Sequence, residues 1–197
     1  MSHHTHEHHN LDKEESFKRM VAVLDGKERK QQLSAEAIIS YLPDLKGKTV
    51  FDGGAGTGYL TLPLAKEAEK VIAFDQSQKM LDLIQERAAQ EQLTTITSMS
   101  GDIKAIDLPD SSVDVAIVSV MIHEVHPFED ALEELSRIIK PEGQIVILEF
   151  ESETTHANGG HRIPSSVMKA SLEKQQLPII QQLIPAEGMY LFVVGKK

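Results

Sequence analysis

The sequence predicts an α/β protein with a mostly parallel sheet, helices on both faces and an antiparallel hairpin near the C-terminal end. Three observations lead to this fold class. Strand and helix patterns alternate from residue 49 onward, which is typical of parallel sheets with right-handed crossovers. Residues 115–118 and 145–148 are continuous apolar runs, as in strands covered on both faces. The last two strand-like runs, 178–184 and 189–194, are joined by four residues, so they must be antiparallel.

The individual elements follow from apolar periodicity and from turn residues. Strands are expected at 49–52, 71–75, 96–99, 113–119 and 144–150, followed by the two strands of the hairpin. Helices are expected at 59–68, 78–90, 128–139 and 165–176. Pro141-Glu142-Gly143 predicts a turn that leads into the fifth strand.

The N-terminal part divides into two segments ahead of the main domain. Residues 1–10 contain five histidines, and we expect a flexible tail, either tag-like or a native arm that captures divalent metal loosely. Residues 11–47 predict a helical lid of one or two helices over the carboxyl end of the first strand. Asp25-Gly26 marks a break in it, and Ser34 marks a helix start. Residues 48–197 form the remaining domain.

Composition narrows the class of partner. The 197 residues carry a net charge of −10 and no Lys/Arg-rich tract, so a nucleic-acid partner is disfavoured and a small molecule is favoured. No apolar run approaches the roughly 20 residues of a membrane-spanning helix, and no membrane association is expected. The chain has no cysteine, which excludes thiolate metal sites and fits a cytoplasmic location. We predict no metal site, and the oligomeric state stays open.

The most informative segment is Val50–Gly58, which reads VFDGGAGTG. Its glycines at 54, 56 and 58 let the backbone turn tightly and approach a ligand. Asp52 precedes them, and Asp75 closes the next predicted strand. Strand, glycine turn, helix, strand and acid form a βαβ unit of the nucleotide-binding type. The spacing does not fit G-x-G-x-x-G, which argues against a dinucleotide.

This order of motifs resembles the class I S-adenosylmethionine-dependent methyltransferases over roughly residues 48–197. The resemblance implies a Rossmann-like seven-stranded sheet and S-adenosylmethionine as the cofactor. It places the amino-acid half of the cofactor on the glycine loop, its ammonium group near Asp52 and both ribose hydroxyls on Asp75. Gly53 stands where the family usually has a larger apolar residue, which should loosen the packing of the strand.

The adenine side follows from two further matches to the family. Gln76 and Met80 match its adenine-side loop, although Met80 is equally expected as helix core. Gly101-Asp102-Ile103 matches a motif in which the acid binds the adenine amino group and the next residue packs on the ring; Asp102 could instead cap a turn. The full set assigned to the cofactor is Asp52, Gly54, Ala55, Gly56, Gly58, Tyr59, Asp75, Gln76, Met80, Gly101, Asp102, Ile103 and Ser119.

The methyl acceptor is expected beyond the carboxyl ends of the fourth and fifth strands. His123 is the leading candidate for the catalytic base, because histidine ordinarily titrates near neutral pH; a packing or capping role is the alternative. His126 precedes a proline and could cap the next helix. A metal set of His123, His126 and Glu149 is a minor alternative, and Glu149 could instead contact the acceptor or form a salt bridge with Arg162.

These residues predict an S-adenosylmethionine-dependent methyltransferase that acts on a small-molecule acceptor. The chain is most similar to the broad group that includes ubiquinone- and menaquinone-type enzymes. The lack of cysteine argues against the arsenite-methylating relatives. The alternatives are a methyltransferase that acts on RNA or protein, and a non-catalytic module that binds S-adenosylmethionine or S-adenosylhomocysteine.

Overall fold

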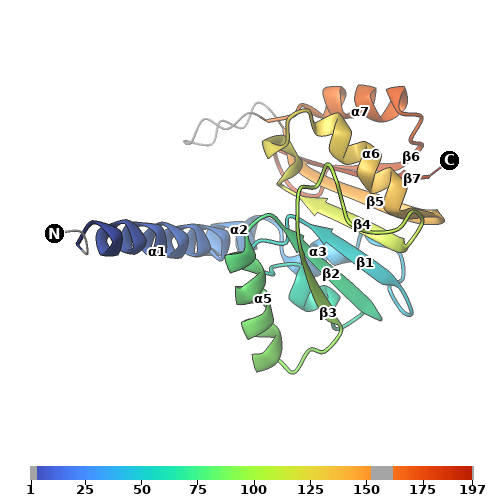
Figure 1. Ribbon diagram of the computed structural model, residues 1–197. Helices are drawn as coiled ribbons and strands as arrows, with labels where there is room; N and C mark the ends of the chain where they lie inside the picture. The colour runs from blue at the N-terminus through green and yellow to red at the C-terminus, as the bar shows by residue number, and fades with distance from the viewer. Residues whose placement is uncertain (1–3, 152–161, 197) are drawn as a thin grey trace.

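The chain folds around one seven-stranded sheet, shown in a computed structural model that describes residues 4–151 and 162–196 (Figure 1). The strand order is β3-β2-β1-β4-β5-β7-β6. The first five strands are parallel, and β7 is antiparallel to both β5 and β6. The predicted fold class, with its C-terminal hairpin, is confirmed. The strands are β1 (Thr49–Gly53), β2 (Lys70–Asp75), β3 (Ile96–Ser100), β4 (Val113–Ser119), β5 (Ile139–Phe150), β6 (Ile179–Leu183) and β7 (Met189–Gly195).

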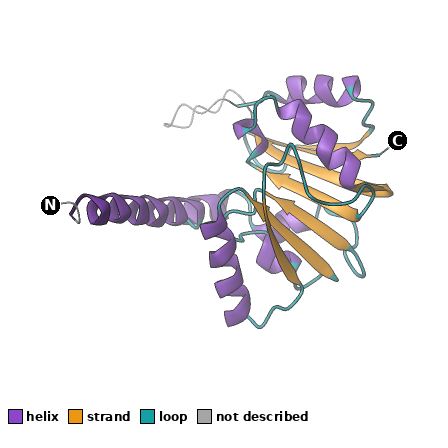
Figure 2. Ribbon diagram, in the orientation of Figure 1, coloured by secondary structure: helices purple, strands orange, loops and turns teal. Residues whose placement is uncertain are grey.

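Helices cover both faces of the sheet (Figure 2). They are α1 (His4–Leu24), α2 (Lys27–Gln32), α3 (Ala35–Ile39), α4 (Thr61–Leu64), α5 (Gln78–Gln90), the 3-10 turn η1 (Ile122–Glu124), α6 (Phe128–Ile138) and α7 (Ser165–Lys174). Successive strand residues point to opposite faces. Phe51 therefore joins the core under α6 and α7, while Val50 joins the core under α3 and α4.

Two predicted elements differ from the structure. The helix expected at 59–68 is reduced to α4, with Pro63 inside it. Pro63 has no N–H to donate, and Lys66 and Glu67 bond three residues back instead of four. The turn expected at Pro141–Gly143 lies inside β5. There the register jumps, because Val113 pairs with Ile139 and Val115 with Gln144.

The N-terminal segment begins as α1, which extends away from the sheet (Figure 1). Residues 4–10, expected in a flexible tail, lie in this helix, which continues through a run of helix-forming Glu, Lys and Arg residues. Residues 1–3 and the histidine side chains of the tail lie outside the described part, and so does their proposed metal capture. The helix ends at the predicted Asp25-Gly26 break, and Ser34 caps α3 by accepting from the Ala37 N–H at 3.2 Å.

The helices α2 and α3 lie between α1 and the sheet domain in the chain. Ile38 and Ile39 of α3 are buried against a sheet face, in the same core as Val50. This segment therefore packs on a face of the sheet, and its role as a lid stays a prediction. Within the described residues, no helix is long and apolar enough to cross a membrane.

Candidate functional site

The predicted site residues gather at one edge of the sheet, where the parallel strands end. The strand order reverses between β1 and β4, and open α/β sheets bind ligands at such a switch point. The glycine loop follows β1, Asp75 ends β2, and His123 follows β4 in η1. The topology thus places Asp75 and His123, which are 48 positions apart in the sequence, at the same end of the parallel strands.

The glycine loop is fixed by backbone hydrogen bonds to the end of β2. The N–H groups of Gly54 and Ala55 donate to the Phe74 carbonyl at 2.8 and 2.9 Å. Gly54 has a φ of +73°, and a Cβ there would lie 2.6 Å from Cγ of Met121. Glycine at 54 is therefore required by both the backbone conformation and the side chain above it.

Asp75 is held between the glycine loop and the turn before α5. Its Oδ2 accepts from the Gly56 N–H at 2.9 Å, and its Oδ1 accepts from the Ser77 N–H at 2.8 Å. The residue is half-buried. Each carboxylate oxygen can accept a second hydrogen bond, so the backbone orients an acceptor pair at the edge of the sheet.

Asp52 faces the protein interior. The residue is 3% exposed, and its Oδ2 accepts from Thr61 Oγ1 of α4 at 2.5 Å. The hydroxyl therefore ties the end of β1 to α4 and satisfies one side of the carboxylate. This geometry gives Asp52 a structural bond, and its contact with a ligand ammonium group stays a prediction.

On the predicted adenine side, several residues serve the fold. Met80 is 2% exposed within α5, which favours its alternative as helix core. Ile103 is 5% exposed and packs in the core with Phe51 and Phe74. Gln76 and Asp102 are exposed, and Asp102 Oδ1 accepts from the Lys104 N–H at 2.9 Å, as a turn acid does.

The remaining assigned residues lie in the glycine loop or at the ends of β3 and β4. Tyr59 donates its hydroxyl to the Leu33 carbonyl at 2.9 Å, which links the loop to the segment after α2. Ala55 is buried with Leu81 of α5. Ser119 is 8% exposed at the end of β4. Gly58 has φ +84°, and Gly101 lies against the Phe74 ring.

Gly53 fits its strand more tightly than expected. A Cβ at this position would lie 3.0 Å from both the Phe51 ring and Cγ1 of Val118. The missing side chain makes room for these neighbours. The prediction that glycine loosens the packing here is wrong.

The predicted acceptor side carries a buried charged cluster made of Glu149, His123 and Arg162. Both oxygens of Glu149 lie 2.9 Å from His123 Nδ1, and the carboxylate is fully buried. Arg162 NH1 lies 3.2 Å from His123 Nε2 and 3.9 Å from Glu149 Oε2. The predicted Glu149–Arg162 ion pair is therefore present, and His123 joins it. The side chain of Arg162 is 14% exposed and that of His123 is 10% exposed.

The backbone beside this cluster is strained. Val120, between β4 and η1, has a φ of +54°. A β-branched residue rarely adopts a left-handed conformation. Its N–H donates to the Leu148 carbonyl at 2.7 Å, which holds the residue in place. Such strain concentrates at functional sites, and here it redirects the chain from β4 toward His123.

The metal-site alternative for the histidines does not match the geometry. Within the part of the chain that the structure describes, no group of three His, Cys, Asp or Glu side chains could hold a metal ion. The N-cap position of α6 is Pro127, and a capping contact of His126 stays a prediction. His126 is exposed, and its carbonyl accepts from Lys104 Nζ at 3.2 Å.

A polar node that the sequence did not predict ties α1 to the glycine loop. Arg87 of α5 donates to Asp25 at 2.6 and 3.3 Å and to the Thr57 carbonyl at 2.8 Å. Thr57 Oγ1 donates to the same aspartate at 2.8 Å. The sequence pattern marks Asp25 only as part of a break signal. Its partners are 32 and 62 residues away, beyond the reach of local pattern analysis.

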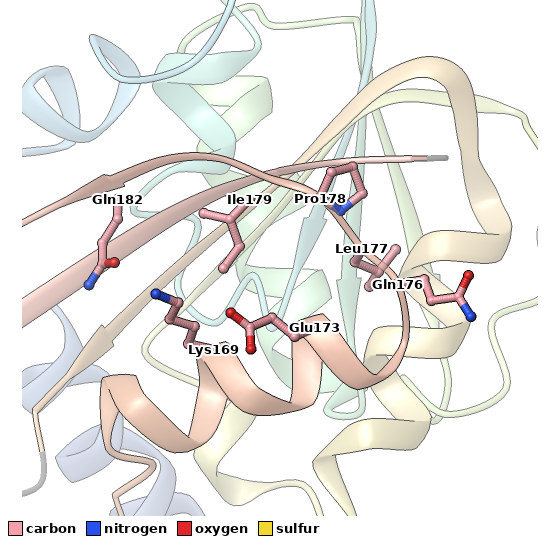
Figure 3. A pocket seen from close by; sticks show the side chains of 7 residues that line it. All are labelled: Lys169, Glu173, Gln176, Leu177, Pro178, Ile179 and Gln182. Atoms are coloured by element: carbon pink, nitrogen blue, oxygen red, sulfur yellow. The ribbon is translucent and has the colours of Figure 1, made fainter.

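Two surface hollows lie away from these residues. One, of about 650 Å³, lies between α7 and β6 and is lined by Lys169, Glu173, Gln176, Leu177, Pro178, Ile179 and Gln182 (Figure 3). The other, of about 340 Å³, lies at the opposite end of the strands, beside Asp114 and Lys140. The candidate site is therefore defined by the strand ends and the polar contacts there.

Comparison with known proteins agrees with this architecture. Residues 51–147 match the family model described as a methyltransferase domain. A malonyl-[acyl-carrier protein] O-methyltransferase from Serratia marcescens is 28% identical over 131 residues, which cover 66% of this chain and 49% of the relative. A demethylmenaquinone methyltransferase from Corynebacterium glutamicum (strain R) is 33% identical over 110 residues, which cover 55% and 45%. The chain thus spans about half of the length of these curated relatives.

Solved structures share the fold. An S-adenosylmethionine-dependent methyltransferase from Aquifex aeolicus has a TM-score of 0.80 at 22% identity, over 91% of this chain and 96% of that one. The [4+2]-cyclase SpnF has a TM-score of 0.76 at 16% identity, over 82% and 80%. At these identities the likeness shows the fold alone.

Strand order, glycine loop and the acid that ends β2 together define a Rossmann-like protein of the methyltransferase type. The chain carries a methyltransferase domain over residues 51–147. Over this range it is similar to the S-adenosylmethionine-dependent methyltransferases.

Proposed function

We propose that this chain is an S-adenosylmethionine-dependent methyltransferase that acts on a small-molecule acceptor. The observation that carries the proposal is the Asp75 carboxylate, which the backbone N–H groups of Gly56 and Ser77 orient at the switch point of the sheet. The names of relatives that act on malonyl-[acyl-carrier protein] and demethylmenaquinone support a small acceptor group.

The donor set at the site fits this cofactor. A ribose offers two hydroxyl donors, and Asp75 has spare acceptor capacity on both oxygens. Asp102 is exposed and can accept from the adenine amino group, while the glycine loop presents backbone at the end of β1. The cofactor has no phosphate that these acids would repel. When bound, S-adenosylmethionine supplies a methyl group on an activated sulfonium carbon.

On the acceptor side, we assign His123 as the catalytic base. Its ring lies at the carboxyl end of β4, and Glu149 fixes its orientation through Nδ1. A methyltransferase must also align the two reactants and exclude water. The small exposure of His123, 10% of its side chain, is consistent with a site sheltered from solvent.

Calorimetric titration with S-adenosylmethionine tests the cofactor site. Asp75→Asn should weaken binding roughly tenfold to a hundredfold, because a charged acceptor of two hydroxyls becomes neutral. Asp107→Asn removes an exposed acid from the connection between β3 and β4 and should bind like the wild type. Unchanged affinity in Asp75→Asn would show that the ribose lies elsewhere.

A turnover assay separates catalysis from simple binding. Release of S-adenosylhomocysteine with a panel of small acceptors is the expected result. The structural likeness to a [4+2]-cyclase shows that this fold also accompanies another reaction. A protein that binds the cofactor but releases no product with small-molecule, RNA or protein acceptors would be the non-catalytic module.

A further inference from the structure

The Glu149–His123–Arg162 cluster points to a particular chemical class of acceptor, an inference that rests on the proposed function. We propose that the methyl acceptor presents an ionisable hydroxyl on an unsaturated carbon, as in a phenol or an enol. His123 takes the proton of this hydroxyl, and Arg162 binds the resulting oxyanion. Glu149 acts as a positioning residue for the imidazole.

The contacts define which ring nitrogen of His123 carries the proton. Nδ1 lies 2.9 Å from both oxygens of Glu149, which as a carboxylate can only accept. Nδ1 is therefore the donor. Arg162 NH1 lies 3.2 Å from Nε2 and 3.4 Å from Nδ1, so it is close to both ring nitrogens and does not decide between them. We therefore assign the lone pair of the neutral imidazole to Nε2 on the Glu149 contacts.

Arg162 is held where it can reach the same oxygen. Its guanidinium carbon lies 4.8 Å from the centre of the Phe150 ring, and its NH1 lies close to both nitrogens of His123. Because NH1 and Nε2 are 3.2 Å apart, an acceptor oxygen bonded to Nε2 comes within reach of the arginine. A guanidinium keeps its charge at any physiological pH, so it suits a developing oxyanion.

The proton step balances in charge. The acceptor O–H bond breaks, the proton forms a bond with Nε2, and the oxygen keeps the electron pair. The cluster then holds Glu149 and the oxyanion as negative groups, and Arg162 and the imidazolium as positive ones. The number of charges rises without a change in net charge, which limits the cost of ionisation in a sheltered site.

The other titratable groups around His123 do not replace it as the base. Tyr190 of β7 pairs with Glu149 in the sheet and donates its hydroxyl to the Ile163 carbonyl at 2.8 Å. Burial, and then the charges of Glu149 and Glu151, raise the pKa of Tyr190 far above its usual range, so it stays protonated. Glu124 Oε1 is 4.0 Å from Nε2, but its side chain is 70% exposed and therefore screened by water.

The same arrangement disfavours two other kinds of acceptor. A carboxylic acid is already ionised at neutral pH and needs no base. An alkyl amine is cationic at neutral pH, and the arginine beside Nε2 repels a cation. A phenolic hydroxyl is neutral at this pH and gains from both groups, because one removes its proton and the other stabilises its charge.

Optical titration of 4-nitrophenol tests the proposal without any methyl transfer. The full-length chain is saturated with S-adenosylhomocysteine, and the phenolate absorbance is followed against pH. In the wild type, the bound phenol should ionise at lower pH than the free phenol. His123→Gln and Arg162→Gln should each weaken phenolate binding roughly tenfold to a hundredfold, and Arg162→Lys should restore part of the loss. His126→Gln, a matched exposed histidine three residues away, should behave like the wild type.

Each outcome bears on the proposal. Circular dichroism of every variant establishes that it is folded. If Arg162→Gln does not fold, Arg162→Lys, which keeps the charge, serves as the second variant. Three results would overturn the proposal. The wild type binds no phenolate, or the folded variants bind phenolate as well as the wild type does. In the third, 4-nitrobenzoate binds more tightly than 4-nitrophenol and its binding does not depend on His123. Calorimetry with S-adenosylmethionine is read separately. Wild-type protein that binds this cofactor but no phenolate keeps the proposed function and loses the acceptor class; protein that binds no cofactor loses the proposed function itself.

Discussion

The ion pair between Asp25 and Arg87 should hold the N-terminal helix against the glycine loop. Arg87 donates to the two oxygens of Asp25 at 2.6 and 3.3 Å, and both side chains are 27% exposed. A second ion pair, Lys66–Glu91, has a similar length of 2.7 Å but is 57% and 41% exposed. The two pairs therefore differ mainly in their shielding from solvent.

Shielding sets the expected magnitudes. A charged hydrogen bond contributes about 1.5–3 kcal/mol when water is excluded. The Asp25–Arg87 pair makes two such bonds but retains about a quarter of its exposure, so we expect a coupling energy of about 1–2 kcal/mol after screening. For Lys66–Glu91, surface pairs of this kind give roughly 0–0.5 kcal/mol.

Double-mutant cycles in urea unfolding measure both couplings. One cycle uses Asp25→Ala and Arg87→Met, which keeps the apolar stem of the arginine. The other uses Glu91→Ala and Lys66→Met. Equal coupling energies in the two cycles, or a larger value for the exposed pair, would refute the argument that burial of Asp25 and Arg87 anchors α1.

Three further predictions concern stability and the loop. Hydrogen bonds from Arg137, opposed by burial, lower the pKa of Glu134; Glu134→Gln should therefore lose stability at neutral pH. Its difference from the wild type should begin to shrink as pH falls below about 4.5, the ordinary value for this carboxyl, and should be lost once pH is below the lowered pKa of the folded state. Leu135→Ala, at a fully buried position of α6, should lower the free energy of unfolding in urea by about 2–5 kcal/mol. Gly54→Ala should lower the free energy of unfolding by about 1–2 kcal/mol because residue 54 has a left-handed conformation. The added Cβ should also clash with Met121, and Met121→Ala in the same chain should relieve this further loss.

Each of these has a contradicting result. A Glu134→Gln difference that persists unchanged at pH 3 would mean that ionisation of this carboxyl does not stabilise the fold. A Leu135→Ala loss no larger than that of Val23→Ala, at a position 72% exposed, would contradict the assigned core. If Met121→Ala leaves the Gly54→Ala defect unchanged in thermal unfolding, the conformation alone explains it.

The sheet could be predicted from the sequence because its signals are local. Continuous apolar runs gave β4 and most of β5, and the short connection after β6 gave the hairpin. The differences arise where one residue overrides the surrounding pattern. Pro63 removes a donor from the helix expected at 59–68. The register jump opposite Asp114 turns an expected turn into an irregular part of β5.

The cofactor edge could likewise be predicted, because Asp75 and the glycine loop belong to one βαβ unit. Side-chain direction was not predictable in the same way. Asp52 and Ile103 lie in the expected motifs, yet Asp52 bonds to Thr61 inside the protein and Ile103 fills the core. A motif places a residue at the edge of the sheet, whereas the packing of α4 and of the facing core decides where its side chain points.

The cluster of Glu149, His123 and Arg162 shows how far a site on the acceptor side can be predicted from the sequence. Glu149 follows the apolar run 145–148 and is fully buried at the end of β5. A carboxylate in that place needs partners, because an unpaired buried charge is very costly. The demand can be inferred from the strand pattern alone, and Arg162, 13 residues after Glu149, is a partner that the sequence offers. The direct contact with His123, 26 residues before Glu149, depends on the fold. A charged residue that directly follows a buried strand is therefore a reason to search for a site there, and only the fold identifies which side chains complete it.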